Sequence, residues 1–154
     1  MQLLHILEDD RCYVIVLEYC KNGTLKQMVE ARNRLTPFEI RFFGQQLIQV
    51  LLYMQSKNVL HRDLCLANCL LNEKLVIKLC DFEFCAELSS SHATRFTQIG
   101  FYHFRPPEMC NRQGYSVKSN SWALGCLLYQ MAVGHYPFGH EEKCVDLVKL
   151  AIMR

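Results

Sequence analysis

The stretch VLHRDLCLANCLLNEKLVIKLCDFEF, from Val59 to Phe84, places polar side chains between short apolar runs. Two of these runs, Cys69–Leu71 and Leu75–Cys80, flank the polar turn NEK and predict a β-hairpin. In an antiparallel hairpin, the residues just outside the two strands meet at the same end. We therefore expect Asn68 and Asp81, which occupy those two positions, to lie close together.

A third oxygen-bearing side chain, Asp63, lies five residues before Asn68 on the loop that leads into the hairpin. Carboxylate and amide oxygens suit Mg²⁺, which prefers a few protein ligands together with phosphate oxygens. A separate carboxylate can orient a hydroxyl group and accept its proton. The alternative is that these residues form turns, in which their side chains cap the loop backbone. The spacing of all three together favours a chemical site.

The composition is that of an ordinary globular domain. The 154 residues are 51% hydrophobic and 21% charged, which is enough for one core. Because the net charge is +2 and no basic run exceeds two residues, we expect neither nucleic acid nor a membrane as a partner. The N-terminus lacks the basic segment of a signal peptide, and no apolar run approaches the roughly 20 residues of a membrane span.

Nine cysteines are scattered along the chain, without a CxxC pair or a cysteine–histidine spacing typical of zinc sites. Most lie within apolar segments, where a free thiol packs as a small hydrophobic group. We expect these thiols to be reduced, which indicates an intracellular protein of the cytoplasm or nucleus.

The rest of the pattern predicts a mainly helical chain. Leu3–Leu7 and Cys12–Leu17 are short apolar runs around an acidic turn and are expected to pair as strands. A short helix is expected near Thr24–Ala31. The segment TPFE, with Thr36 as N-cap, begins a long helix with one buried face. The segment SNSWALGCLLYQMAV, which ends at Gly134, is apolar nearly all round and is expected to lie buried at the centre.

Several segments resemble the motifs of protein kinases. HRDLCLAN is similar to the catalytic loop H-R-D-L-x-x-x-N, and CDFE is similar to D-F-G with its glycine replaced. YVIVLEYCKNGTL resembles the kinase hinge, RPPE resembles A-P-E, and SVKSNSWALGCLLYQM resembles the central-helix signature. LLNEKLVIKLCDFE and VGHYPF are most similar to polo-like serine/threonine kinases.

The resemblance implies an α+β, mainly α fold: a partial protein kinase domain over residues 1–154, in truncated and degenerate form. Residues 24–154 would form an incomplete large (C-terminal) lobe. Residues 18–23 would form the hinge, and residues 1–17 would be remnant strands of the small lobe.

The same resemblance implies ATP and Mg²⁺ as cofactors. Asp63 would be the catalytic base, Asn68 would belong to the catalytic loop, and Asn68 and Asp81 would bind Mg²⁺.

The nucleotide base would lie against the hinge. Leu17 takes the gatekeeper position, and Glu18 to Cys20 would offer backbone groups to adenine. Leu70 would form the floor under the adenine, and Cys80 would complete the cofactor site.

Two further positions suggest regulation. Arg62 precedes the catalytic aspartate, as in kinases that are activated by phosphorylation of the activation loop, and Thr97 matches the acceptor position. A phosphothreonine at position 97 would pair with Arg62 and order the loop. The alternative is an unmodified serine- and threonine-rich loop.

Other family features are missing. A kinase uses a Gly-rich loop over the phosphates, a strand lysine on the phosphates, and a helix glutamate that pairs with this lysine. The sixteen residues before Leu17 contain neither glycine nor lysine.

Four residues inside the retained motifs also depart from the family pattern, and a fifth keeps its identity but lacks its partner. Cys65 stands where serine/threonine kinases place a lysine, and a thiol cannot replace that cation. Glu83 removes the backbone freedom of glycine and adds negative charge beside a metal ligand. Asn120 keeps the shape of a bracing aspartate but loses its charge, and the ring of Phe101 is expected to crowd a substrate hydroxyl. Glu108 lacks its usual arginine partner in this sequence.

These departures lead us to favour a catalytically impaired pseudokinase that acts as a binding module. A protein partner would cover the exposed strands within residues 1–17. Two alternatives stay open: an active Mg-ATP-dependent serine/threonine protein kinase, and the product of a degraded or incomplete gene.

Overall fold

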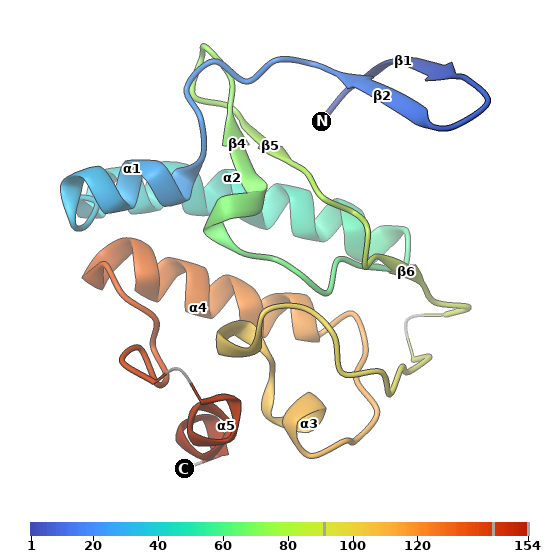
Figure 1. Cartoon of the computed structure of the whole chain (residues 1–154). Helices are drawn as coiled ribbons and strands as arrows, with labels where there is room; N and C mark the ends of the chain where they lie inside the picture. The colour runs from blue at the N-terminus through green and yellow to red at the C-terminus, as the bar shows by residue number, and fades with distance from the viewer. Residues whose placement is uncertain (91, 143, 154) are drawn as a thin grey trace.

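Helices α2 (Pro37–Ser56) and α4 (Ser119–Val133) pack against each other and form the core of the chain (Figure 1). The structure is a computed structural model that describes residues 1–90, 92–142 and 144–153. Apolar side chains from both helices are fully buried between them, including Leu47 of α2 and Leu127 and Met131 of α4. The mainly helical α+β fold that the sequence predicts is confirmed.

Helix α2 begins where the sequence predicts. The Thr36 hydroxyl accepts a hydrogen bond from the Glu39 N–H, and the Glu39 carboxylate accepts one from the Thr36 N–H at 2.9 Å. The guanidinium of Arg32, the last residue of α1 (Leu25–Arg32), pairs with both oxygens of Glu39. This reciprocal cap satisfies backbone donors at the start of α2 and joins it to α1.

The second hairpin of the prediction is present but shorter. Strand β4 (Cys69–Leu71) pairs antiparallel with β5 (Ile77–Leu79), and Leu70 lies opposite Lys78. The predicted start at Leu75 is wrong, because Leu75 has a left-handed backbone, with φ 57°, and belongs to the turn. The 3₁₀ segment η1 (Leu66–Asn68) leads directly into β4.

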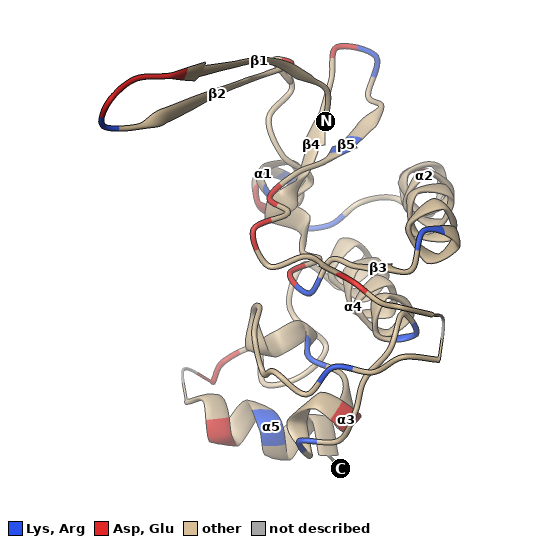
Figure 2. Cartoon of the chain, turned by 90° about the vertical axis from the view of Figure 1, so that its right-hand side faces the viewer, with Lys and Arg blue, Asp and Glu red and all other residues tan. Residues whose placement is uncertain are grey.

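Strands β1 (Leu3–Glu8) and β2 (Tyr13–Leu17) form the predicted strand pair, which projects away from the helices (Figure 1). Figure 2 shows acidic residues at its turn. There the Asp9 carboxylate accepts hydrogen bonds from two main-chain N–H groups of the turn. The apolar side chains of this hairpin are exposed on both faces. It therefore does not contribute to the core.

The helices formed by Pro107–Cys110 and Val145–Met153 lie on the other side of α4 from α2 (Figure 1). Helix α5 (Val145–Met153) packs against α3 (Pro107–Cys110) and the 3₁₀ segment η2 (Tyr102–Phe104). A small ladder pairs β3 (Val59–Leu60) with β6 (Ala86–Glu87). None of the helices in the described ranges is long and apolar enough to cross a membrane.

Helix α4 ends at Gly134, with φ 93°, as predicted. The expectation that this helix is buried on all sides is only partly correct. Tyr129 and Val133 keep 40% and 43% of their surface exposed. The side of α4 that carries Tyr129 and Val133 is therefore partly open, whereas α2 and η2 pack against other parts of the helix.

The two faces of α2 give a test of where the stability lies. We expect Leu47→Ala to lower the free energy of unfolding by about 2–5 kcal/mol, because Leu47 is fully buried. Leu52→Ala is the matched control, since Leu52 is 54% exposed and is expected to change stability by less than about 0.5 kcal/mol. Urea unfolding followed by circular dichroism measures both variants. Equal losses would contradict the assignment of the buried face.

The cap on α2 predicts a pH dependence. The hydrogen bonds from Arg32 and Thr36 lower the pKa of Glu39 from 4.5 to about 2. Because the folded-state pKa is depressed, this stabilisation is complete above the unfolded pKa near 4.5 and is lost as the pH falls toward 2. We expect Glu39→Gln to flatten the decline of stability over that interval, as measured by thermal unfolding. Glu73→Gln, at an exposed turn position, is the control and should keep the wild-type profile.

Candidate active site

His61 attaches the loop that carries Asp63 to a neighbouring segment of the chain. This side chain is fully buried, its Nε2 donates to the Cys80 carbonyl oxygen at 3.1 Å, and its ring packs against Phe82. Burial lowers the pKa of His61, so the imidazole is neutral near pH 7. A neutral ring can keep this single main-chain hydrogen bond without carrying a buried charge. The contact joins the loop to the segment that leads into Asp81.

Asn120 of α4 braces the same loop from the other side. Its Oδ1 accepts a hydrogen bond from the His61 N–H at 3.4 Å, and its Nδ2 donates to the Val59 carbonyl oxygen at 3.2 Å. An aspartate could make the first of these bonds but not the second, because a carboxylate has no N–H to donate. Asn120 therefore lacks the charge of an aspartate but makes a second hydrogen bond that an aspartate could not make.

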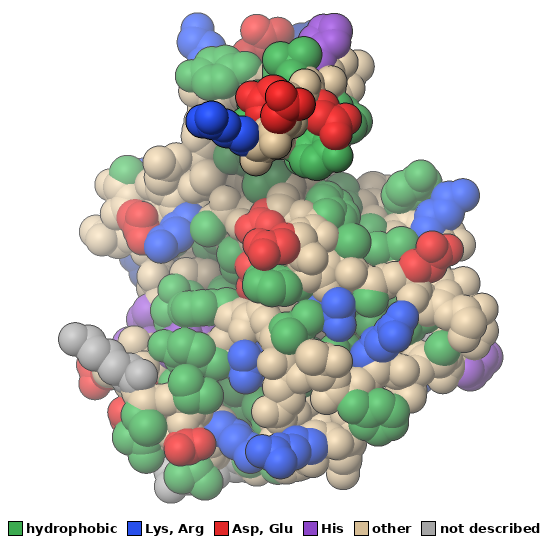
Figure 3. Space-filling model, turned by 45° about the vertical axis from the view of Figure 1, so that its right-hand side comes forward, with side chains coloured by type: hydrophobic (Ala, Val, Ile, Leu, Met, Phe, Trp, Pro, Cys, Tyr) green, Lys and Arg blue, Asp and Glu red, His purple; other side chains and the backbone are tan. Residues whose placement is uncertain are grey.

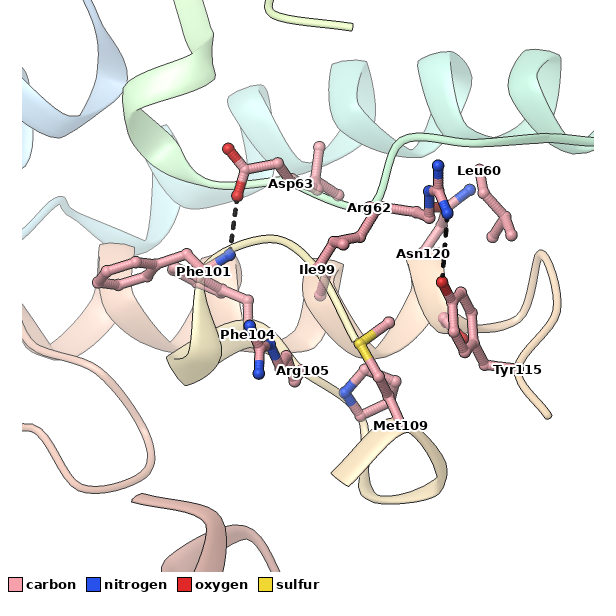
Figure 4. Close-up of a pocket in the computed structure, with 14 residues that line it drawn as sticks. Leu60, Arg62, Asp63, Ile99, Phe101, Phe104, Arg105, Met109, Tyr115 and Asn120 are labelled. Atoms are coloured by element: carbon pink, nitrogen blue, oxygen red, sulfur yellow. Dashed lines mark hydrogen bonds between the residues drawn. The ribbon is translucent and has the colours of Figure 1, made fainter. Parts of the chain in front are cut away.

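Asp63 and Asn68 lie in direct contact. Asn68 Nδ2 donates to the main-chain oxygen of Asp63 at 2.9 Å and to its Oδ2 at 3.1 Å. The other carboxylate oxygen, Oδ1, accepts a hydrogen bond from the Phe101 N–H at 2.9 Å, as Figure 4 shows. The main chain of Phe101 thus supplies the contact that the family makes through a threonine at this position.

Asp81 is positioned through the neighbouring Cys80, whose N–H donates to the Asn68 carbonyl oxygen at 3.0 Å. Asp81 has a left-handed backbone, with φ 59°, and is exposed. Its carboxylate and the Oδ1 of Asn68 make no hydrogen bond or ion pair with the residues that the structure describes. A carboxylate and an amide oxygen at one end of a hairpin are hard ligands, so this pair fits Mg²⁺.

Glu83 requires a correction. We expected the loss of glycine here to restrict the backbone, but Glu83 has no positive φ, and the left-handed residue of this segment is Asp81. The backbone therefore accepts a side chain at position 83 without strain. What Glu83 adds is an exposed negative charge two residues after the candidate metal ligand.

A cavity of about 410 Å³ opens beside the catalytic loop. Asp63, Cys65, Asn68 and Phe101 all line it. Burial raises the pKa of the Cys65 thiol, so this side chain is neutral at physiological pH. The sequence interpretation that position 65 lacks a cation is therefore supported by the environment of the thiol.

Three residues of this cavity were missed by sequence reasoning: Lys26, Gln130 and Tyr136. Lys26 comes from α1, which packs against η1, and its ammonium lies 3.6 Å from the Glu30 carboxylate. Gln130 is buried in α4, and none of the residues that the structure describes donates a hydrogen bond to its Oε1. A polar residue in an otherwise apolar helix was the available signal for Gln130, whereas Lys26 reaches the cavity only through tertiary packing.

The ring of Phe101 lies in the aromatic group that closes this cavity. Its centroid is 5.6 Å from that of Tyr136 and 6.0 Å from that of Phe104. Phe101 and Asp63 line the same cavity. That the ring crowds a hydroxyl brought to Asp63 stays a prediction.

The residues expected to contact adenine lie at the end of β2, in the segment that follows it, in β4 and just after β5. None of them lines the 410 Å³ cavity. Leu17 ends β2 and is 43% exposed, Cys20 is buried, and Leu70 is half-buried in β4. Cys80 follows β5 and is half-buried, and its thiol donates to the Asn68 carbonyl oxygen at 3.4 Å.

Glu18 is already engaged within the chain. Its N–H donates to the Gln2 carbonyl oxygen at 2.9 Å, and its carboxylate lies 3.0 Å from the Lys78 ammonium. The hydrogen bond from Lys78 is the largest of the effects that lower the pKa of Glu18. The main-chain N–H of Glu18 is therefore not free for a nucleotide base.

The two regulatory candidates are connected through a tyrosine. Arg62 donates to the carbonyl oxygens of Phe84 and Cys85, and its Nη1 lies 3.5 Å from the Tyr115 hydroxyl (Figure 4). That hydroxyl donates to the Thr97 carbonyl oxygen at 2.7 Å. The Thr97 side chain is exposed, so a modifying enzyme can reach it. Pairing of Arg62 with a phosphate on Thr97 stays a prediction.

Glu108 has a partner that the sequence did not indicate. The Ser119 hydroxyl donates to its Oε1 at 3.2 Å, which links α3 to the start of α4.

Comparison with known proteins places this geometry in context. The protein kinase domain family matches residues 1–153. Serine/threonine-protein kinase PLK2 of Mus musculus is 37% identical over 138 residues, which are 90% of this chain and 20% of that protein. Serine/threonine-protein kinase PLK4 of Xenopus tropicalis is 36% identical over 155 residues, or 99% and 16% of the two chains. The chain thus spans about a fifth of the length of these relatives.

Gly100 offers a test of the loop that holds Asp63. Its φ is +76°, and an added Cβ would overlap the Arg62 carbonyl oxygen. We expect Gly100→Ala to destabilise the chain by about 1–2 kcal/mol or more, because the left-handed backbone and the overlap both oppose a side chain. Gly125→Ala is the matched control: it has open space within helix α4, and about 0.5–1 kcal/mol of stabilisation is expected. Chemical unfolding of both variants should give shifts of opposite sign, and a neutral Gly100→Ala would refute the close approach.

Proposed function

The chain belongs to the protein kinase family, and on that premise we propose that it is a kinase-like binding module that does not phosphorylate peptides by itself. Its similarity to polo-like serine/threonine kinases covers the catalytic loop and the central helix. Asp63, Asn68 and Asp81 stand at the sequence positions of the phosphate-handling residues of kinases, and this supports the kinase-like part of the proposal. The surroundings of Asp63 do not favour transfer to a substrate hydroxyl.

The observation that carries this proposal is the neutral thiol beside Asp63. Phosphoryl transfer needs positive charge near the oxygens of the transferring group, and loss of one preorganised donor costs about 10²–10³ in rate. Burial keeps Cys65 protonated and uncharged in the cavity that Asp63 lines. Phe101 lines the same cavity, so we expect a peptide hydroxyl to meet both a missing charge and a bulky residue.

ATP and Mg²⁺ are the cofactors of protein kinases, and the donor set of this chain fits the metal. Asn68 Oδ1 and the Asp81 carboxylate would hold Mg²⁺, and bound ATP would supply the phosphoryl group. The hinge residues would face the nucleotide base, but the N–H of Glu18 is paired with Gln2. Because this N–H is already engaged, we expect nucleotide binding by this chain to be weak.

The hairpin of β1 and β2 supports the binding role. Ile6 and Ile15 face each other across the strands and are 58% and 61% exposed, and Leu7 and Val14 repeat this on the opposite face. Figure 3 shows hydrophobic side chains on this projecting part. An isolated two-stranded hairpin is marginally stable in water and gains from a third strand. The partner that we propose is therefore a protein segment that adds a strand to this hairpin.

One observation favours the alternative of an active serine/threonine kinase. Lys26 lines the cavity of Asp63 and Cys65 and brings a cation from a different element. Its ion pair with Glu30 is exposed, so it holds Lys26 weakly.

Phosphate transfer from radiolabelled ATP decides between the two functions. We expect the purified chain with Mg²⁺ and a serine/threonine peptide to give the same background as Asp63→Ala. Circular dichroism must show that both proteins are folded. Transfer that is present in the wild type and disappears in both Asp63→Ala and Lys26→Gln would establish the active enzyme and the role of Lys26.

A further inference from the structure

A second cavity, of about 120 Å³, lies between α3, the first turn of α5 and the segment that precedes α3. We infer that this cavity, which we call the basic pocket, binds a phosphate-class dianion. Its lining includes the side chains of Arg105, Arg112 and Lys149, together with Gln98, Cys110 and Asp146. This inference concerns a different site from the one around Asp63 and does not depend on whether the chain transfers phosphate.

The charges of the basic pocket are not balanced. Arg105, Arg112 and Lys149 make no ion pair within 4.0 Å among the residues that the structure describes. Among the described residues, Asp146 is the one carboxylate in the lining, and the Cys110 thiol is kept neutral because burial raises its pKa. The described lining thus carries three positive charges and one negative charge, and this excess of two matches a dianion. In Figure 2, basic positions lie on α5 and beside α3, at the end of the molecule opposite the acidic hairpin turn.

Arg105 provides a donor that the protein does not use. Its Nη2 donates to the Gly100 carbonyl oxygen at 2.9 Å, and its buried Nε has no hydrogen-bond partner among the residues that the structure describes. A guanidinium has five N–H groups, so this one bond leaves other donors of Arg105 for an anion in the pocket. The planar guanidinium can donate two parallel hydrogen bonds to a phosphate, so Arg105 is suited to this ligand.

Two backbone features favour the same ligand. Val145 and Asp146, the first residues of α5, line the pocket, and the first turn of a helix carries free N–H groups and a partial positive charge. Arg112 follows α3 in a left-handed conformation, with φ 57°, which stops the helix and brings this side chain to the pocket. The cations thus come from three separate segments that the fold brings together.

The basic pocket is linked to the catalytic loop through Arg105. The guanidinium that lines the pocket also holds the Gly100 carbonyl oxygen, and the N–H of the next residue, Phe101, donates to Asp63. An anion on Arg105 would therefore act on the segment that contacts the catalytic carboxylate. This makes the basic pocket a candidate effector site.

Binding measurements on the whole chain test the inference. Inorganic phosphate and a phosphothreonine peptide are titrated by calorimetry, with chloride and the unphosphorylated peptide as blanks at equal ionic strength. We expect saturable binding of a phosphate group, and at least tenfold weaker binding in the double variant Arg112→Gln with Lys149→Gln. The matched control is Lys21→Gln with Lys74→Gln, which removes two exposed positive charges elsewhere and should bind like the wild type.

Each outcome has a defined meaning. Binding of inorganic phosphate indicates a free anion as ligand, and binding of the phosphopeptide alone indicates a phosphorylated protein segment. Absence of binding for both probes would overturn the inference. Equal weakening in the two double variants would also overturn it, because the effect would then follow net charge and not the pocket. Circular dichroism checks that every variant is folded.

Discussion

The Asp63 carboxylate joins the segments that make up the site. Each of its oxygens accepts a hydrogen bond from a different part of the chain, Oδ2 from Asn68 and Oδ1 from the N–H of Phe101. Gly100 makes the second bond possible, because the loop approaches Arg62 so closely that a side chain does not fit. The geometry of the loop that carries Asp63 thus depends on one anionic side chain and one missing Cβ. The chain has kept this arrangement although its chemical surroundings differ from those of an ordinary kinase.

Local structure was predictable from the sequence because its hydrogen bonds are local. The cap at Thr36 and the stop at Gly134 each require particular residues within a few positions, and both are present as predicted. The contact between Asp63 and Asn68 follows from a five-residue loop in the same way. Leu75 was misassigned because an apolar residue in a left-handed turn gives no signal in the hydrophobic pattern.

Tertiary contacts were not predictable from motifs. Lys26 and Gln130 enter the cavity of Asp63 because α1 and α4 pack around the catalytic loop, which no spacing along the chain reveals. The effect of a replaced residue also depends on the contacts that the new side chain makes. Asn120 was interpreted as a loss, yet its amide N–H binds the Val59 carbonyl oxygen, a bond that a carboxylate cannot make. Comparison with a motif identifies the replaced residue but does not reveal the hydrogen bond that the new side chain makes.

The ion pair between Glu18 and Lys78 has a mechanical consequence. It fastens the hinge to β5, and three residues after Lys78 the chain reaches Asp81. The projecting hairpin is therefore joined to the strand that leads to the candidate metal ligand, and its own strands take no part in the two-helix core. A protein bound to the hairpin would therefore act on the segment that leads to Asp81 without displacing the two helices of the core.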